Sequence, residues 1–381
     1  MNQKLKLLCG ACLITSSFYA AADIRLNGFA RIAAGKTLSD DQNHMGYDNK
    51  LDFRNESLFA LQVTGDMGDG LSATAQFMAR GEDDFAVEVE WAYLSYQLTD
   101  STRLNAGRLR IPFFRYSDFL DVGYAYTWLR PPAAVYDLPY TSYDGVSLLY
   151  NTYMGDADIE VQAFTGAAKD TISVEGAPAE TELADVYGAN VTFNMDWLYL
   201  RGVYLTSKAT FNVGAPAFQG LISNLEAAGQ AEAIDQVLVN EDTGSFAGVG
   251  VGLLFGNLNL QGEVTKVGVA DSFIADRTRS YVSASYQFDQ LTPYVLIQKI
   301  DDEANLDGAN SIPDVAPLAG LKAGLAGFLQ DQENTEDGKY YSVGFRYDFH
   351  PSASFKTDLT RWKGDDGEDD KVLTFAIDMV F

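Results

Sequence analysis

Carboxylates and aromatic rings gather in one long segment that starts at Leu109, LRIPFFRYSDFLDVGYAYTWLRPPAAVYDLPYTSYDG. Asp118, Asp121 and Asp137 stand among ten aromatic residues, and four prolines stiffen the chain by fixing φ. A loop this apolar must pack against other parts of the protein, because wet loops do not carry so many rings. We therefore expect the segment to place its aspartates at an opening that it narrows.

Arginines recur where they would face those aspartates, and the set consists of Arg31, Arg54, Arg80, Arg108 and Arg110. Alternation puts the first three on the polar faces of the first three predicted strands. For the last two the alternation is ambiguous, because apolar residues share their face. Arginines opposite carboxylates create a transverse field that orients dipolar solutes and passes small ions. The alternative is that each arginine only pairs with a neighbouring acid and stabilises the wall.

Catalytic and metal-binding chemistry has little support in the sequence. His44 and His350 are the two histidines, and they fall at opposite ends of the predicted fold. No G-x-S-x-G segment is present. The acidic runs DDEANLDG and GDDGEDDK lack the distal glutamate of a calcium loop. We predict no enzyme activity, no metal site and no cofactor.

Strict alternation marks the end of the chain, DDKVLTFAIDMVF. Phe375, Ile377, Met379 and Phe381 share one face of an extended strand, and Asp378 lies on the other. Similar alternation recurs in LSATAQFMAR, NLNLQGEVTK, RSYVSASYQF and SASFKTDLTRW. The pattern predicts strands with one apolar and one polar face, and a last strand that is anchored rather than frayed.

Connections between these strands alternate between short turns and long links, which is typical of a transmembrane barrel. The expected long links are residues 39–50, 111–143, 167–181, 207–244, 268–277, 301–338 and 363–370. The pattern predicts about sixteen antiparallel strands that close into an all-β barrel, because lipid leaves no unpaired strand edge. A soluble β-sandwich or propeller is the alternative, but no blade repeat is found. Helical periodicity predicts amphipathic helices in two links, 218–240 and 315–330.

Export is indicated by residues 1–22, MNQKLKLLCGACLITSSFYAAA, which have a basic start, an apolar run and an A-x-A site. We predict a signal peptide at 1–22 and a barrel domain at 23–381. Both cysteines fall in the removed part, and a lipoprotein interpretation of LCGAC fits less well. Loss of Lys4 and Lys6 takes the net charge from -26 to -28. Such a charge argues against nucleic acid and anionic lipid surfaces as partners, because both are polyanions.

The signal peptide, DIRLNGFARIAAG, GRLRIPFFRYSDFLDVGYAYTWLRPP and the terminal FAIDMVF together resemble a Gram-negative general porin, more like the marine gammaproteobacterial type. The resemblance implies a homotrimer of sixteen-stranded barrels in the outer membrane, with the third external loop folded inward as a constriction. It also implies outer-membrane lipids, lipopolysaccharide and the barrel assembly machinery as partners, and Phe381 as part of the assembly signal. The usual PEFGGD-like loop tip is replaced by SDFLDVGYAYTW.

Together these features predict a water-filled channel for passive diffusion of small hydrophilic solutes and ions. Acids outnumber bases, 53 to 27, which favours a mild preference for cations. The alternative is a channel specific for one solute class. Aromatic residues such as Tyr124, Tyr126 and Trp128 would suit a sugar, whereas a phosphate channel would need basic residues unopposed by acids.

Overall fold

The computed structural model describes residues 23–39, 43–174, 177–334 and 337–381. The predicted signal peptide, 1–22, lies outside the described residues. Alternating sequences form sixteen strands within the described part. They are β1 (Asp23–Thr37), β2 (Leu58–Gly68), β3 (Leu71–Arg80), β4 (Val87–Thr99), β5 (Thr102–Arg110), β6 (Ser142–Met154), β7 (Ala157–Val174), β8 (Ala177–Asn194), β9 (Leu198–Val213), β10 (Asn240–Phe255), β11 (Leu258–Val269), β12 (Asp276–Tyr286), β13 (Leu291–Glu303), β14 (Gly338–His350), β15 (Ala353–Gly364) and β16 (Asp369–Val380).

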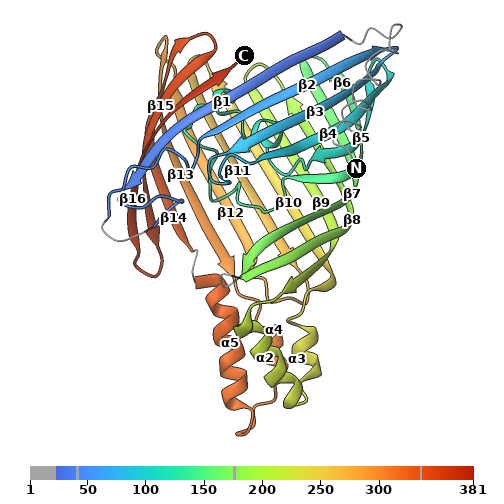
Figure 1. The fold of residues 1–381 in the computed structure, drawn as a ribbon, viewed down its shortest axis with the longest axis vertical. Coiled ribbons are helices and arrows are strands. Elements are labelled where there is room, and N and C mark those ends of the chain that lie inside the picture. Colours follow the sequence, from blue (N-terminus) through green and yellow to red (C-terminus); the bar gives the residue numbers. More distant parts are fainter. Residues whose placement is uncertain (1–22, 40–42, 175–176, 335–336) are drawn as a thin grey trace, which may run out of the picture.

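Each strand pairs with its sequence neighbours, and β1 also pairs with β16, so that the sheet closes into a barrel (Figure 1). The predicted all-β, sixteen-stranded antiparallel barrel is confirmed. β16 runs along residues 29–37 of β1, from Phe29 opposite Val380 to Thr37 opposite Val372. The last residue continues this pairing, because Phe381 and Gly28 exchange two backbone hydrogen bonds of 2.8 and 2.9 Å. Closure leaves neither terminal strand with a free edge.

The two faces of the sheet differ as the alternation predicts. On β16 and at the terminus, Phe375, Ile377 and Phe381 are 38%, 37% and 61% exposed. On the opposite face of the same strand, Thr374 and Asp378 are 0% and 1% exposed. The apolar face of a closed barrel therefore points away from the protein, which suits lipid rather than water.

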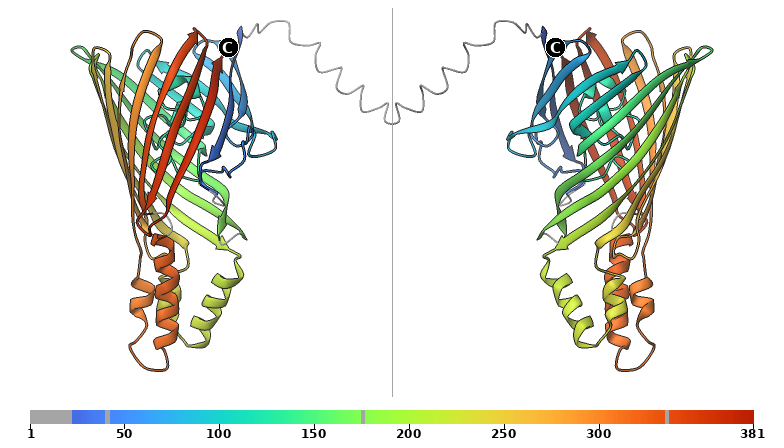
Figure 2. Two further views of the ribbon diagram at one scale, coloured as in Figure 1. Left: turned by 90° about the vertical axis from the view of Figure 1, so that its left-hand side faces the viewer. Right: turned by 90° about the vertical axis from the view of Figure 1, so that its right-hand side faces the viewer.

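Short turns join the strands at one end, and longer links join them at the other, where the helices project (Figure 2). Gly155 and Gly256 sit in two of the tight turns with φ of 65° and 60°, a backbone region that disfavours residues with a Cβ. One expected link is wrong. Residues 167–181 are largely strand, because β7 and β8 continue as a hairpin to Val174 and Ala177. The stretch is rich in polar residues, which is typical of loops, but its backbone continues the β7–β8 pairing.

Four helices pack against one another beyond the barrel (Figures 1 and 2): α2 (Pro216–Ala227), α3 (Ala231–Asp235), α4 (Asp307–Ser311) and α5 (Ala319–Asn334). The helical periodicity of 218–240 and 315–330 is confirmed, whereas α4 was not predicted. Phe218 and Phe328 lie 5.7 Å apart between ring centres, and Phe273 from the β11–β12 link joins them. No described helix is both long and apolar enough to cross a bilayer.

Candidate pore constriction

The aromatic segment of the sequence becomes the link between β5 and β6, residues 111–141, and we call it the β5–β6 segment. It contains two short 3-10 turns, at Ser117–Phe119 and Gly123–Ala125. Its rings are buried against distant strands: Phe113 lies 4.7 Å from Phe246 of β10, and Trp128 lies 5.4 Å from Tyr281 of β12. The expectation that this apolar segment packs against other parts of the protein is met.

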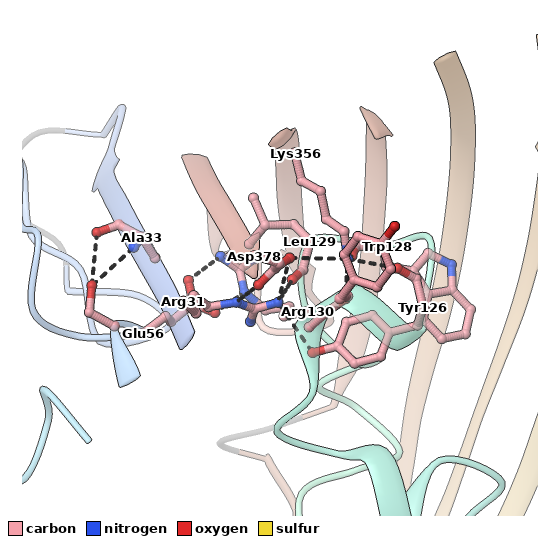
Figure 3. A network of polar contacts seen from close by, with 12 residues as sticks. Arg31, Ala33, Glu56, Tyr126, Trp128, Leu129, Arg130, Lys356 and Asp378 are labelled. Carbon is pink, nitrogen blue, oxygen red and sulfur yellow. Dashed lines mark hydrogen bonds and ion pairs between the residues drawn. The ribbon is translucent and has the colours of Figure 1, made fainter. Parts of the chain in front are cut away.

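Three cations hold the backbone of the β5–β6 segment, and two of them, Arg31 and Lys356, are labelled in Figure 3. Lys356 of β15 donates to the carbonyls of Gly123, Tyr126 and Trp128 at 2.5, 2.7 and 2.7 Å. Arg31 of β1 donates to the carbonyl of Leu129 at 2.7 Å, and Arg346 of β14 donates to those of Tyr124 and Tyr126 at 2.7 and 3.2 Å. Charged donors thus bind the turn carbonyls of the segment, of which that of Gly123 also accepts the backbone N–H of Tyr126 at 3.5 Å.

Asp378 of β16 supplies the opposite charge for two of these cations. Its carboxylate lies 2.6 Å from Arg31 and 3.3 Å from Lys356, and all three side chains are buried. A buried carboxylate between two cations lowers the cost of keeping them away from water. The last strand therefore fixes both the closure of the barrel and the position of the segment.

A second wall, made by β11, β12 and β13, binds the other side of the segment. The hydroxyl oxygen of Tyr294 accepts the backbone N–H of Leu129 at 3.0 Å, and the hydroxyl oxygen of Ser283 accepts the indole N–H of Trp128 at 2.7 Å. Arg279 forms an ion pair of 2.8 Å with Asp137. Asp137 therefore belongs to an ion pair that anchors the β5–β6 segment to β12.

On the side of β1 to β3, a cavity of about 300 Å³ remains between the segment and the strands. Arginines and acids both line it, and these charged residues are Arg31, Arg80, Arg130, Glu56, Glu82 and Asp121. Here the structure brings two of the predicted arginines, Arg31 and Arg80, together with Asp121 of the segment. The predicted arrangement of opposed charges is therefore present, but the opposing groups are in direct contact.

Asp121 is the carboxylate at the centre of this charge cluster. It lies 2.5 Å from Arg110 and 3.1 Å from Arg80, and both arginines also pair with Glu90. Burial alone would raise the pKa of Asp121, but the two arginines outweigh it and hold the pKa below the ordinary value. Asp121 is therefore ionised at neutral pH.

Arg130, which was not among the predicted site residues, forms the second charged contact at the cavity. Its guanidinium binds Glu56 through two bonds of 2.5 and 2.8 Å. The hydroxyl of Tyr47 donates to the same carboxylate at 2.7 Å. Burial opposes ionisation of Glu56, but Arg130 more than compensates and lowers its pKa. The forked geometry ties the β1–β2 link to the β5–β6 segment.

The remaining predicted residues lie apart from the cavity. Arg54 was expected on a strand, which is wrong: it lies in the β1–β2 link, where its exposed side chain pairs with Asp84. Arg108 is exposed and stands opposite Ala92 and Asp144, on the apolar face of the sheet. Arg108 shares its face with Leu104 and Ala106, and the β5–β6 ladder runs from Thr102 to Arg110 without a register shift.

Asp118, also predicted for the constriction, forms no ion pair within the described ranges. Lys356, Arg346 and Asp378 were missed as site residues, although alternation alone puts each on the polar face of its strand. Alternation does not predict which residue each side chain contacts, because each of them bonds to a residue more than two hundred positions away in the sequence. No group of three potential metal ligands is found among the described residues.

The model of the Gram-negative porin family matches residues 9–379. The chain belongs to the Gram-negative porin family. No curated protein matches this porin by sequence. Among solved structures, it is similar to a loop-deletion form of OmpT, an outer membrane protein of Vibrio cholerae, at 14% identity and a TM-score of 0.59, over 95% of this chain and 100% of that one.

Two further porin structures match this porin over nearly their whole lengths. OmpF of Salmonella typhi is 16% identical with a TM-score of 0.58, over 96% of this chain and 99% of that one. The anion-selective porin from Comamonas acidovorans is 12% identical with a TM-score of 0.59, over 94% and 100%. Identities this low support the fold alone. Family and fold together place this porin in the outer membrane as a β-barrel channel, and the resemblance found in the sequence is confirmed at the level of the family.

Proposed function

We propose that this porin is a general diffusion pore for small hydrophilic solutes and ions, with a mild preference for cations. The observation that carries the proposal is the pairing of the arginines at the cavity. Arg31, Arg80 and Arg130 each contact at least one carboxylate. Glu82, at the same cavity, forms no ion pair with any described residue. Paired arginines offer little free positive charge to a passing anion, so the unpaired acid sets the sign of the field.

We further propose that the β5–β6 segment is the third external loop, folded into the lumen as the constriction. Its support is that side chains of β1, β12, β13, β14 and β15 all bond to it. With sixteen strands the lumen is too wide for wall side chains to fill, so the cavity beside the segment would be the narrowest part of a watery path. In this arrangement Arg31, Arg80, Arg110 and Asp121 belong to the constriction.

Reversal potentials in planar bilayers under a salt gradient test the proposal. We expect a modest excess of cation over anion permeability at neutral pH. Clear anion selectivity would reject the charge argument while leaving the channel itself intact. Absence of any conductance from the folded protein would reject the diffusion pore.

A channel specific for a sugar or for phosphate is the second candidate. Tyr126 and Tyr136 line the cavity beside the charged groups, and an aromatic wall suits a sugar ring. Saturable block of conductance by one solute, at concentrations where others have no effect, would favour this candidate. A phosphate channel is less well supported, because the arginines at the cavity are already paired with acids.

Assembly and export complete the proposal. We propose a homotrimer, exported by residues 1–22, inserted by the barrel assembly machinery through the terminal Phe375, Ile377, Met379 and Phe381, and without enzymatic activity. Conductance steps of the purified, heat-modifiable oligomer test these points together, since a trimer gives three equal closures. A single closing step per insertion would contradict the trimer.

A further inference from the structure

The link between β1 and β2 contains a tight turn at residues 44–47, which we call the β1–β2 turn. The backbones of His44 and Tyr47 exchange two hydrogen bonds of 2.9 and 3.0 Å. The two residues between them, Met45 and Gly46, have positive φ of 54° and 76°, as a two-residue turn of this kind requires. The side-chain amide of Asn55 donates to the carbonyl of Met45 at 2.9 Å, so the turn has a defined shape.

Aromatic rings fix both ends of the β1–β2 turn to the wall of the barrel. The ring of Tyr47 is 1% exposed and lies over Gly35 of β1, where a Cβ would stand 2.7 Å from the nearest ring carbon. The ring of His44 contacts Trp362 of β15 and Tyr340 of β14, at 5.9 and 5.7 Å between ring centres. The turn is therefore held on β1 at one end and on β14 and β15 at the other.

Both contacts lie inside the barrel, on the long-link side of the charged cavity. Gly35 follows Arg31 by four residues on β1, and Trp362 follows Lys356 by six residues on β15. Side chains at even spacing along a strand share a face, so these positions share the inner face with Arg31 and Lys356. Both strands run toward the long-link end. A solute that enters from this end therefore meets the β1–β2 turn before it meets the charge cluster.

The β1–β2 turn also reaches the β5–β6 segment. The guanidinium of Arg130 donates to the sulfur of Met45 at 3.8 Å, and Ala134 of the segment belongs to the same buried cluster as Trp362. Four residues of the link line the cavity: Met45, Asn55, Glu56 and Ser57. The cavity is thus bounded by the β5–β6 segment on one side and by the β1–β2 link on another.

The side chains at this edge of the cavity act by size rather than by charge. Met45 and Asn55 carry no charge at any pH. Burial lowers the pKa of His44, and Arg130 adds to this effect, whereas Asp370 opposes it. The imidazole is therefore neutral at pH 7 and stacks as an aromatic ring.

We propose that the β1–β2 turn is a second inward-folded element, and that Met45 and Asn55 form a rim that sets the largest solute this porin admits. The inference rests on the proposed function, because it takes the cavity to be part of the diffusion path. A neutral rim limits size, whereas the charged groups beneath it set ion preference. A turn that only covers the wall would leave permeation unchanged when the side chain at position 45 is enlarged.

Thiol labelling of Met45→Cys in the purified protein tests the inference. Both cysteines of the chain, Cys9 and Cys12, fall in the predicted signal peptide, so the introduced cysteine would be the one thiol of the exported protein. The matched control is Leu51→Cys, in the same link, where Leu51 is 54% exposed and does not line the cavity. The probe is a neutral benzyl methanethiosulfonate, and mass spectrometry measures the extent of labelling.

Labelled Met45→Cys should conduct at least about twofold less in planar bilayers than the unlabelled variant, because the width of a pore limits flow through it. In liposome swelling it should admit a pentose and exclude a disaccharide. Labelled Leu51→Cys should behave like the wild type. Unchanged conductance and sugar flux in fully labelled Met45→Cys would overturn the inference. Failure of this thiol to react in a conducting protein would also overturn it, because water must reach a rim residue.

His44→Ala tests the aromatic anchor of the turn without labelling. The control is His350→Ala, since His350 is exposed at the short-turn end of β14. Loss of the ring contacts should let the turn leave the wall and widen the entrance. We expect the disaccharide-to-pentose flux ratio to rise at least about twofold for His44→Ala only, with the cation-to-anion permeability ratio unchanged. Equal flux ratios in the two histidine variants would overturn the assignment of the rim to an anchored turn.

Conductance of the wild type separates this inference from the proposed function. A conducting wild type, together with a labelled Met45→Cys that conducts equally, would reject the rim and keep the diffusion pore. A wild type that passes one solute alone, and loses that passage when labelled at position 45, would support the rim and reject the general pore. Absence of conductance would reject both.

Discussion

The ring of Phe381 occupies the space that a side chain at Gly28 would need. A Cβ built on Gly28 would lie 2.4 and 2.5 Å from two ring carbons of Phe381. The same two residues exchange backbone hydrogen bonds where the first and last strands meet, and Phe59 of β2 stacks on the ring at 5.9 Å. The closing contact of the barrel is therefore an aromatic ring seated over a glycine.

Gly28→Ala should impair closure. The added methyl group must displace the ring of Phe381 or spread the β1–β16 pair, and overpacking of this kind costs about 1 to 3 kcal/mol. We expect a reduced fraction of folded barrel, measured by the mobility shift between heated and unheated samples in gel electrophoresis.

Gly65→Ala is the matched control, since a Cβ at Gly65 on β2 meets nothing within 4 Å. It should fold like the wild type. Equal folded fractions for the Gly28 and Gly65 variants would show that the ring of Phe381 is not constrained where β1 meets β16.

Deletion of Phe381 should leave synthesis and export intact but lower membrane assembly.

Asp378→Asn should destabilise the protein strongly. The substitution leaves Arg31 and Lys356 buried without their carboxylate, and loss of one partner from a buried ion pair costs about 3 to 5 kcal/mol. The free energy of unfolding in urea, measured in detergent micelles, reports the loss. We also expect noisier single-channel currents, because the two cations hold the β5–β6 segment.

The control for this prediction lies on the same strand. Asp369 pairs with Arg361, but both side chains are about two-fifths exposed, at 41% and 43%. Water and salt screen such a pair, so Asp369→Asn should change unfolding little. A similar loss of unfolding free energy for both substitutions would mean that burial does not explain the contribution of Asp378 to stability.

Arg80→Glu should shift selectivity further toward cations, whereas Arg54→Glu should not. Arg80 lines the cavity, with its side chain 19% exposed. Arg54 does not line it, and its side chain is 57% exposed, where screening is strong. We expect the cation-to-anion permeability ratio from reversal potentials to rise by at least about twofold for the first variant only. Equal shifts would place Arg54 on the ion path.

Acid should destabilise the constriction only below about pH 4.5. Asp121 and Glu56 both have a lowered folded-state pKa. A carboxyl with a depressed pKa contributes stability that is fully present above its unfolded value, about 4, and is lost as pH falls through the folded value. Thermal unfolding temperature should therefore stay level from neutral pH to about 4.5 and fall below that.

The double variant Asp121→Asn with Glu56→Gln removes both titrating groups. It should unfold at a lower temperature at neutral pH, and its unfolding temperature should depend less on pH in the acid range. An unchanged acid slope in this variant would assign the pH dependence to other carboxyls.

The sequence by itself determined the barrel. Period-two alternation is a local property, so it could be read strand by strand, and the alternation of short and long links followed from it. The two-faced last strand and the helical periodicity of residues 218–240 and 315–330 were also local patterns, and each appears in the structure. The family could be recognised for the same reason.

Only the tertiary structure decided which charged groups meet. Alternation placed Arg31 and Asp378 on polar faces, but their contact depends on the register of β1 against β16, which joins residues 347 positions apart. Arg54 shows the opposite failure, because its alternating neighbours do not form a ladder and leave it in a link. A side chain's face is set by its own strand, whereas its partner is set by closure of the whole barrel, and no local period encodes that closure.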